Sequence, residues 1–240
     1  MNRNKWPKRL YKFKGSLNLF YSLILLRYTP LNDFYLKKLF HSYPVERLHV
    51  GCGLLLLKGW CNVLFEPNQE YGRLRKVKGK DVLNYNLLKP WPWPRNSISV
   101  IAGSHFIEHL DLNQCIKFCK EAFNVLKSGG TIRLSCPDLE IYALKYTSND
   151  NGFFKHEEIK KACAFKAAET PSQIFAAKAY DSGGAHKWFH DFSSLKNVLE
   201  RAGFGSVRKV GRLEGNTPDL ELLEPAPREI ETLYVEAIKS

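Results

Sequence analysis

Short apolar runs alternate with longer amphipathic segments along most of this chain of 240 residues. Apolar runs bounded by glycine, proline or asparagine predict buried strands. Runs of this kind cover residues 47–51, 61–65, 98–102, 131–136, 206–210 and 232–238. A 3.6-residue apolar period predicts helices over 112–126 and 193–202, each ended by glycine. Such alternation indicates an α/β domain with a largely parallel sheet.

One connection is short for this scheme. Only eight residues, 54–61, separate Gly53 from Asn62. A crossover between parallel strands usually takes a dozen residues or more, most of them helical. The sequence therefore predicts that the first crossover is a turn or a shortened helix.

The segment 148–185 is long and irregular, and it stands between the fifth strand and the last helix–strand unit. Long insertions in compact domains are usually functional lids or disordered segments. The predicted organisation is a helical N-terminal extension over 1–43 and a main domain over 44–240, with a lid insertion at 148–185.

Charge is concentrated at one end of the chain. The composition, 44% hydrophobic and 25% charged, is that of a globular protein. The net charge is +12, and residues 1–40 carry +8 of it, with nine Lys and Arg against one Asp. The main domain is only mildly basic, so the total charge does not by itself indicate a nucleic-acid partner.

The extension 1–43 mixes these cations with aromatic residues around the apolar run 17–26. This mixture suits a helix lying on an anionic membrane surface. A helix that packs on the sheet or on a partner subunit is the other interpretation. The run is about half of a bilayer span and precedes no small-residue cleavage site. The predicted location is cytoplasmic, with peripheral association at the inner face of the membrane as an option.

The six cysteines predict no metal site. Cys115 and Cys119 are four residues apart on a predicted helix, whereas zinc needs three or four ligands. We interpret the cysteines as small buried apolar residues in a reducing compartment.

Gly51-Cys52-Gly53 follows the first predicted strand. Glycines there allow a tight turn and the close approach of a nucleotide-type ligand, although a purely structural turn explains them equally well. Leu54 and Leu56 stand where a dinucleotide fingerprint has its third glycine, and the acid expected about 20 residues later is missing, which argues against NAD.

Six segments in this order resemble class I S-adenosylmethionine-dependent methyltransferases: LHVGCG, KGWCNV, LLKPWPWPRNSISVIAGSHFIEHL, VLKSGGTIRLSCPDLE, AHKWFHDFSSLKNVLERAGF and LYVEAIK. The chain is most similar to small methyltransferases associated with cell-surface polysaccharide biosynthesis. The resemblance implies a Rossmann-like fold with a mostly parallel seven-stranded sheet and an antiparallel last strand. It also implies S-adenosyl-L-methionine as cofactor and methyl transfer to a hydroxyl of a sugar or glycan precursor.

The resemblance places cofactor contacts on this sequence. Gly51 and Gly53 would lie under the carboxypropyl and sulfonium groups, and Asn86 near the adenine. Leu64 stands where the family has the acid that binds the ribose, and Glu66, on the same side of the strand, is the candidate substitute. The departures at positions 64 and 86 motivate an alternative, a degenerate non-catalytic binding protein.

Two segments supply candidate catalytic and acceptor residues. Ser104 and His105 follow the strand 98–102, where α/β sheets bind ligands, so both are predicted to contact the cofactor. His105 also suits a general base. Glu108 and His109 belong to a family motif whose side chains often pack or cap.

The cluster that closes the insertion offers His186 as a second base, Lys187 as a cation for an acidic sugar or phosphate, and Trp188 as an aromatic face for a sugar. A core position for Trp188 is equally open. Asp138 either caps the next helix or lines the acceptor site.

A further alternative is an RNA methyltransferase, motivated by the charge of +12. Five cations fall between Arg73 and Lys80, which is either a solvated loop or a phosphate-binding run. No stacking aromatic residues interleave with them, so nucleic acid is the less favoured partner, and a small-molecule or glycan acceptor is preferred.

Overall fold

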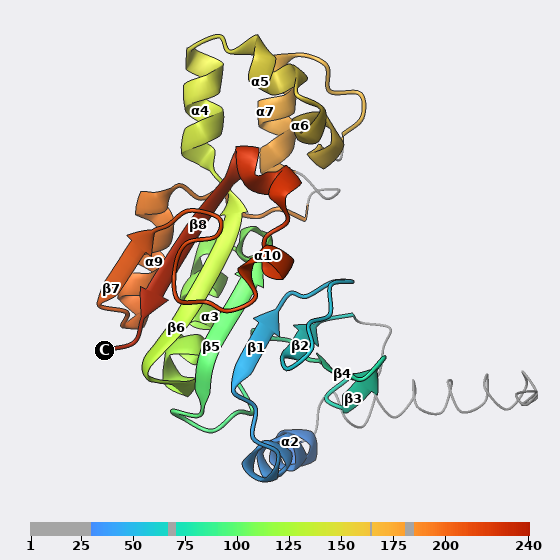
Figure 1. Ribbon diagram of the computed structural model, residues 1–240, viewed down its shortest axis with the longest axis vertical. Helices are drawn as coiled ribbons and strands as arrows, with labels where there is room; N and C mark the ends of the chain where they lie inside the picture. Colours follow the sequence, from blue (N-terminus) through green and yellow to red (C-terminus); the bar gives the residue numbers. More distant parts are fainter. Residues whose placement is uncertain (1–29, 67–70, 164, 181–184) are drawn as a thin grey trace, which may run out of the picture.

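The computed structural model describes residues 30–66, 71–163, 165–180 and 185–240, which form a mixed sheet with helices on one face and a helical lid at one end (Figure 1). The strands are β1 (Arg47–Val50), β2 (Cys61–Leu64), β3 (Leu74–Val77), β4 (Lys80–Asn84), β5 (Ile98–Ser104), β6 (Leu126–Pro137), β7 (Ser206–Lys209) and β8 (Thr232–Ile238). The helices are α2 (Pro30–Ser42), α3 (Leu112–Val125), α4 (Leu139–Thr147), α5 (Asn151–Lys155), α6 (Glu157–Ala162), α7 (Pro171–Ala179), α9 (Phe192–Ala202) and α10 (Leu220–Leu223), with 3-10 turns η2 (Ile107–His109) and η3 (Ala226–Glu231).

The strand order is β3-β4-β2-β1-β5-β6-β8-β7. Strands β4, β2, β1, β5 and β6 are mutually parallel, and the order reverses between β1 and β5, as in doubly wound Rossmann-like sheets. Strand β8 runs antiparallel to both β6 and β7. The predicted Rossmann-like topology and the antiparallel last strand are confirmed.

The prediction of seven strands is wrong, because the sheet has eight. The additional strand is β3, which forms an antiparallel edge hairpin with β4. Lys78 and Gly79 both have positive φ angles, of 49° and 76°, as a tight two-residue hairpin turn requires. The run of cations hid this strand, because an exposed edge strand needs no continuous apolar pattern and is often charged.

One face of the sheet is apolar and is covered by helices. Every second residue of β1, β6 and β8 joins the main hydrophobic core, together with the buried faces of α3 and α9. Helix α3 begins with a capping box between Asp111 and Gln114, and α9 ends at Gly203 in the left-handed conformation. Asp191 caps α9, and its side chain accepts from the Ser194 N–H.

The opposite face of the sheet is polar and nevertheless buried. Its side chains are His49, Asn62, Asn84, Arg133, Ser135 and Glu236. Two irregular segments cross this face (Figure 1). One is the first crossover, which is a turn, the first of the two forms that the sequence predicted. The other is residues 211–231, which include the short α10. Buried polar groups are stable only when hydrogen-bonded. Asn62, Arg133 and Glu236 bond to the crossing backbone, whereas His49 and Ser135 bond to neighbouring side chains.

Asn62 shows how a turn replaces the missing crossover helix. Its amide donates to the carbonyl oxygens of Leu57, Trp60 and Asp81, at 2.9–3.1 Å, and its carbonyl oxygen accepts from the Leu57 N–H at 2.7 Å. These bonds satisfy backbone groups that a helix would have paired internally.

Arg133 anchors the second crossing segment. Its guanidinium lies 3.2 Å from a Glu224 carboxylate oxygen and 3.4 Å from one of Glu236. It also donates to the carbonyl oxygens of residues 211, 212 and 214. The buried charges are thereby paired and their hydrogen-bonding capacity is used.

The sequence predicted an irregular lid insertion, but the structure shows that this segment is helical. Helices α4 to α7 enclose a hydrophobic cluster of their own around Tyr142, separate from the main core. These helices are short, and side-chain caps at Asp150, His156 and Thr170 define where they begin. Helices of five to nine residues hold too few turns for a clear apolar period, which explains why the sequence pattern missed them.

Of the predicted extension 1–43, residues 1–29 lie outside the described residues. Helix α2, which follows them, packs on the main core through Leu36 and Phe40, whose ring centroid is 5.3 Å from that of Trp93. Within the described part of the chain, no helix combines the length and apolar character needed to cross a bilayer.

Candidate functional site

A pocket of about 270 Å³ opens at the carboxyl ends of β1, β2 and β4. It is lined by Gly51, Val63, Leu64, Phe65, Tyr85, Asn86, Leu87, Leu88, Phe106, Leu110 and Lys187. Doubly wound sheets bind their ligands in this position, beyond the carboxyl ends of the strands next to the reversal of strand order. The walls are mostly apolar, with one amide and one cation, which is the usual composition of a small-molecule site.

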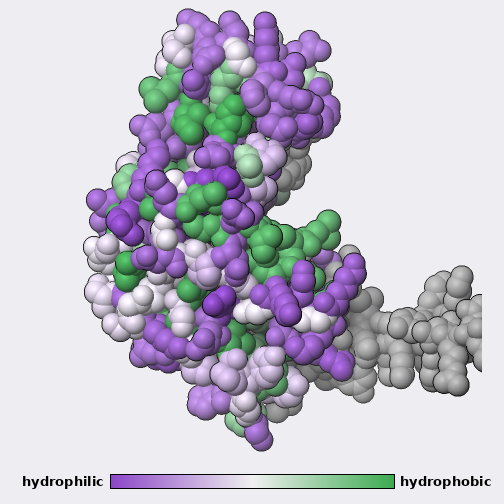
Figure 2. All heavy atoms as spheres, in the orientation of Figure 1, coloured by the Kyte–Doolittle hydropathy of each residue, from purple (hydrophilic) through white to green (hydrophobic). Residues whose placement is uncertain are grey.

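The molecular surface is hollowed between the lid and the β1–β2 side of the sheet, with hydrophobic residues along the lower rim (Figure 2). Leu54, Leu55 and Phe65 are exposed apolar side chains of the loops that follow β1 and β2. The part of the surface next to the predicted glycine turn is therefore apolar.

Gly51 adopts a φ of +62°, and a Cβ atom at this position would come within 2.4 Å of the Phe106 ring. Glycine is thus required at position 51 for two reasons: the left-handed backbone of the turn, and the close packing of the Phe106 ring against it. Gly53 is also left-handed, with φ of +49°, but the space around it is open and it does not line the pocket. Between them, burial raises the pKa of the Cys52 thiol to about 12, so this cysteine is no nucleophile at neutral pH.

Of the predicted cofactor contacts, Gly51 and Asn86 line the pocket, and Gly53, Glu66, Ser104 and His105 do not. Leu64 and Asn86 line it, and the Asn86 side-chain oxygen accepts from the Leu88 N–H at 3.0 Å, which orients the amide. Glu66 is exposed beyond the end of β2 and is not among the lining residues. Its backbone is held on both sides by the side chain of Asn84, at 2.8 and 2.9 Å.

Ser104 and His105 lie away from the pocket, toward residues 224–232. The Ser104 hydroxyl donates to Glu224 at 3.0 Å. His105 Nδ1 accepts from Arg228 at 2.9 Å, and its Nε2 lies 3.1 Å from the Thr232 hydroxyl oxygen. Because Thr232 donates its own proton to the Arg228 carbonyl, His105 Nε2 is the donor, and both ring nitrogens are engaged.

The cluster that closes the lid meets η2. Lys187 and Trp188 both donate their backbone N–H groups to the Glu108 carbonyl, at 2.8 and 3.2 Å, and the Lys187 side chain lines the pocket. The His186 ring packs edge-on against that of His109, with centroids 4.9 Å apart. Trp188 is 39% exposed, so it is not a core residue.

Asp138 is fully buried. Its carboxylate accepts from the Glu140 N–H as the cap of α4 and lies 3.2 Å from Lys209 Nζ. Of the two interpretations of Asp138, this geometry is that of the cap, and Asp138 does not line the pocket.

Glu108 is buried beside three histidines. Burial raises the pKa of its carboxyl, but the neighbouring His105 and His109 lower it by more, so the carboxyl is ionised at neutral pH. The sequence motif contained Glu108 and His109, but it did not indicate that His186, 77 residues later, lies beside them.

Sequence reasoning missed the apolar walls of the pocket, above all Phe106 and Tyr85. Their sequence position could have indicated them, because Tyr85 directly follows β4 and Phe106 lies two residues after β5. It also missed Arg228 and Thr232, which hold His105 from more than 120 residues away, and for them the sequence contains no local signal.

No family model matches this sequence, and no curated protein does. Among solved structures, the chain is similar to an S-adenosylmethionine-dependent methyltransferase from Archaeoglobus fulgidus, with 15% identity, a TM-score of 0.47, and coverage of 86% of this chain and 94% of that one. A methyltransferase from Thermotoga maritima, a possible histamine N-methyltransferase, has 17% identity, a TM-score of 0.47, and coverage of 95% and 97%. Human N-acetylserotonin methyltransferase in complex with S-adenosylmethionine has 12% identity, a TM-score of 0.46, and coverage of 94% and 56%. Likeness at this level assigns no activity to the chain.

Proposed function

We propose that this protein is an S-adenosylmethionine-dependent methyltransferase that acts on a hydroxyl of a sugar or glycan precursor. The observation that carries the proposal is the apolar pocket beside Gly51, at the carboxyl ends of β1, β2 and β4 of a doubly wound sheet. Four of the six sequence segments that resemble class I methyltransferases contribute residues to its lining, among them Gly51, Val63, Phe106 and Lys187.

The lining residues fit most of the cofactor. The apolar walls suit the adenine ring, and the Asn86 amide can hydrogen-bond its edge. Leu64 cannot bind the ribose hydroxyls, so these would depend on Glu66 at the rim. Missing one neutral hydrogen bond costs about 0.5–1.5 kcal/mol, which weakens such a site without abolishing it. Bound cofactor supplies an activated methyl group on its sulfonium.

For the acceptor, we assign Lys187 and Trp188 to substrate binding, because Lys187 lines the pocket and Trp188 is exposed beside it. His105 and His186 are the candidates for the base that takes the hydroxyl proton. His105 would have to give up the hydrogen bond from Arg228, whereas His186 is oriented by donating Nδ1–H to the Lys178 carbonyl at 2.9 Å.

Calorimetric titration with S-adenosylhomocysteine tests the cofactor site. We expect binding by the unmodified protein and about three- to tenfold tighter binding by Leu64→Asp, which restores an acceptor for the ribose hydroxyls. Leu213→Asp, at an exposed position outside the pocket, is the matched control and should leave affinity unchanged. If neither the unmodified protein nor Leu64→Asp binds at millimolar ligand, the methyltransferase proposal fails.

We also propose that residues 1–43 dock peripherally on anionic membranes at the cytoplasmic face. The described part supports this: on α2, Phe34 and Tyr35 are 68% and 54% exposed, beside exposed Lys37 and Lys38, while Leu36 and Phe40 face the core. Full-length protein should float with anionic vesicles and not with neutral ones. Lys37→Glu with Lys38→Glu should reduce flotation, and equal flotation of both proteins would contradict the role of α2.

A further inference from the structure

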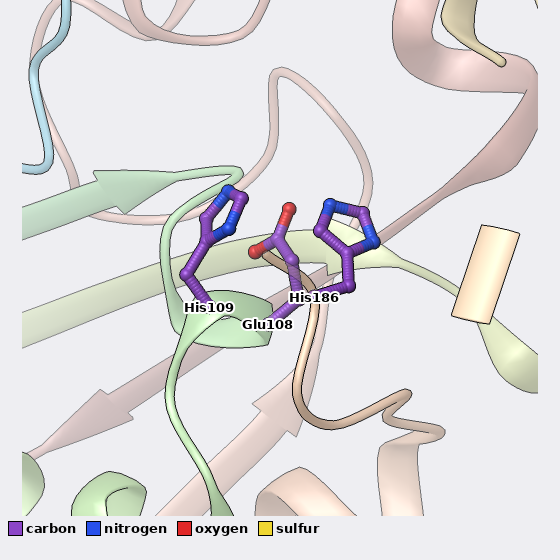
Figure 3. A group of neighbouring side chains, drawn as sticks. All are labelled: Glu108, His109 and His186. Atoms are coloured by element: carbon purple, nitrogen blue, oxygen red, sulfur yellow. The ribbon is translucent and has the colours of Figure 1, made fainter. Parts of the chain in front are cut away.

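Three potential metal ligands meet between η2 and the end of the lid. Glu108 and His109 belong to η2, directly after β5, and His186 belongs to the segment that leaves the lid. Their ligating atoms lie within 4.8 Å of one another. Figure 3 shows the Glu108 carboxylate between the two imidazole rings.

Glu108 points to a missing partner at this place. The residue is only 1% exposed, and among the described residues its Oε2 has no hydrogen-bond partner. Its Oε1 lies 3.4 Å from His105 Nδ1, the nitrogen that already accepts from Arg228. A buried carboxylate without full pairing is strongly unfavourable, and a cation between Glu108 and the imidazoles would compensate it.

The two histidines are held in position by backbone groups. His186 Nδ1 donates to the Lys178 carbonyl at 2.9 Å, which leaves Nε2 as the nitrogen that carries the lone pair. His109 Nδ1 lies 3.3 Å from the Ala185 carbonyl. Hydrogen bonds from a ring N–H to a carbonyl are the contacts that commonly orient metal-binding histidines. The backbone bonds from Lys187 and Trp188 to Glu108 fix the two segments to each other.

We propose that Glu108, His109 and His186 bind one divalent transition-metal ion, with Zn²⁺ as the best fit. Zinc–ligand distances of about 2.0–2.2 Å place the ligand atoms of a tetrahedral site about 3.4 Å apart, so the cluster closes when each ligand atom moves by somewhat less than about 1 Å. Two imidazoles and one carboxylate suit zinc and its neighbours, whereas Mg²⁺ and Ca²⁺ prefer oxygen ligands alone. The nearby cations are directed elsewhere: Arg228 lies 3.0 Å from Glu231, and Lys187 Nζ lies 3.4 Å from Gln114.

Such a site has a consequence for the pocket beside it. Three protein ligands leave at least one coordination position for water or for an oxygen of a bound molecule. Phe106, Leu110 and Lys187, which flank the three ligands in sequence, line the pocket. An ion bound through His186 Nε2 also excludes that nitrogen as a proton acceptor. The inference does not depend on the proposed function and stands even if S-adenosylhomocysteine does not bind.

The test is competition for Zn²⁺ between untagged full-length protein and a chromogenic chelator. We expect one ion per chain and a loss of affinity of at least roughly tenfold for His109→Ala, His186→Ala and Glu108→Gln. His41→Ala removes an exposed imidazole on α2 and should leave the affinity unchanged. The His109 and His186 side chains are only partly buried, so these variants should fold, and circular dichroism checks it.

Co²⁺ substitution provides a second readout that separates this site from the six cysteines. Binding at Glu108, His109 and His186 should give visible d–d absorption without the sulfur-to-metal charge-transfer bands of a thiolate site. The proposal is overturned if the unmodified protein binds no Zn²⁺ at micromolar concentrations. It is equally overturned if all three variants bind as tightly as the unmodified protein, or if thiolate bands appear.

Discussion

His190 shows how a tertiary position changes the chemistry of one side chain. It lies fully buried where the lid returns to the sheet, with Nδ1 2.9 Å from the Ser194 hydroxyl and Nε2 3.7 Å from Cys115 Sγ. Burial lowers the pKa of His190 to about 4, although the negative charges of Glu108 and Asp191 oppose the shift. Nothing in its sequence surroundings distinguishes it from the exposed histidines of the chain.

This depressed pKa predicts an acid-sensitive component of stability. Above pH 6.5 the imidazole is neutral in both states, but between pH 6.5 and about 4 only the unfolded chain takes up the proton. The contribution of His190, about 3 kcal/mol, is therefore fully present above pH 6.5 and lost as the pH falls to 4.

Urea denaturation at a series of pH values checks this, with His190→Asn compared to the unmodified protein. The variant should lose less stability than the unmodified protein across this window, whereas His41→Asn, at an exposed site, should not change the pH dependence. Parallel pH curves for His190→Asn and the unmodified protein would contradict the assignment.

At the scale of elements, one carboxylate joins the lid to the sheet. Glu231, at the end of η3 and next to β8, lies 2.9 Å from Lys178 Nζ of α7 and accepts from the Tyr142 hydroxyl of α4 at 2.6 Å. Lys178 and Glu231 are 2% and 1% exposed. A buried pair of this kind contributes chiefly by avoiding the cost of an unpaired buried charge.

Lys178→Met should therefore destabilise the lid by about 3 kcal/mol, the lower end for a broken buried pair, because Arg228 still lies beside Glu231. Limited proteolysis of the segment 151–179, together with urea denaturation, measures the effect. Lys161→Met breaks the exposed pair with Glu157 and serves as the control, with no change expected. Equal proteolytic resistance of Lys178→Met and the control would show that the pair does not hold the lid.

At the scale of the whole molecule, the described residues form one large hydrophobic core and two small clusters, one in the lid and one around Trp60. The main core joins the apolar face of the sheet to α3, α9 and α2, whereas the lid cluster contains only five fully buried side chains around Tyr142. Regions with few buried apolar contacts open at lower free energy than the global unfolding. We therefore expect helices α4 to α7 to open at lower free energy than the sheet.

Hydrogen exchange measured by mass spectrometry tests this division. Amides of α5, α6 and α7 should exchange faster than those of α3 and β6, under conditions where the main core is protected. Addition of Zn²⁺ should slow exchange near Ala185 and His186 if the proposed ion joins the lid to η2. Uniform protection across both clusters would contradict an independently opening lid.

Local pattern was sufficient for much of the fold. The buried strands β1 and β2 begin where the apolar runs predicted and end one residue earlier, and α3 and α9 agree with their predicted ranges to within one residue. These elements bury an apolar face or are buried on both sides, so their sequence must carry the period. The pattern missed both strands of the β3–β4 hairpin and the short lid helices. The strand β3 is an exposed edge, and the lid helices are too short to show a clear period.

The candidate site also has one part that the sequence predicted and another part that only the folded structure shows. The sequence by itself determined the glycine turn at Gly51 and the place where the first strand ends, because both are local properties. Only the tertiary structure decided that Ser104 and His105 lie away from the pocket, toward residues 224–232, and that His186 joins Glu108 and His109. The physical reason is that burial, pairing of charge and ligand geometry depend on residues far apart in the chain, which meet only when it folds.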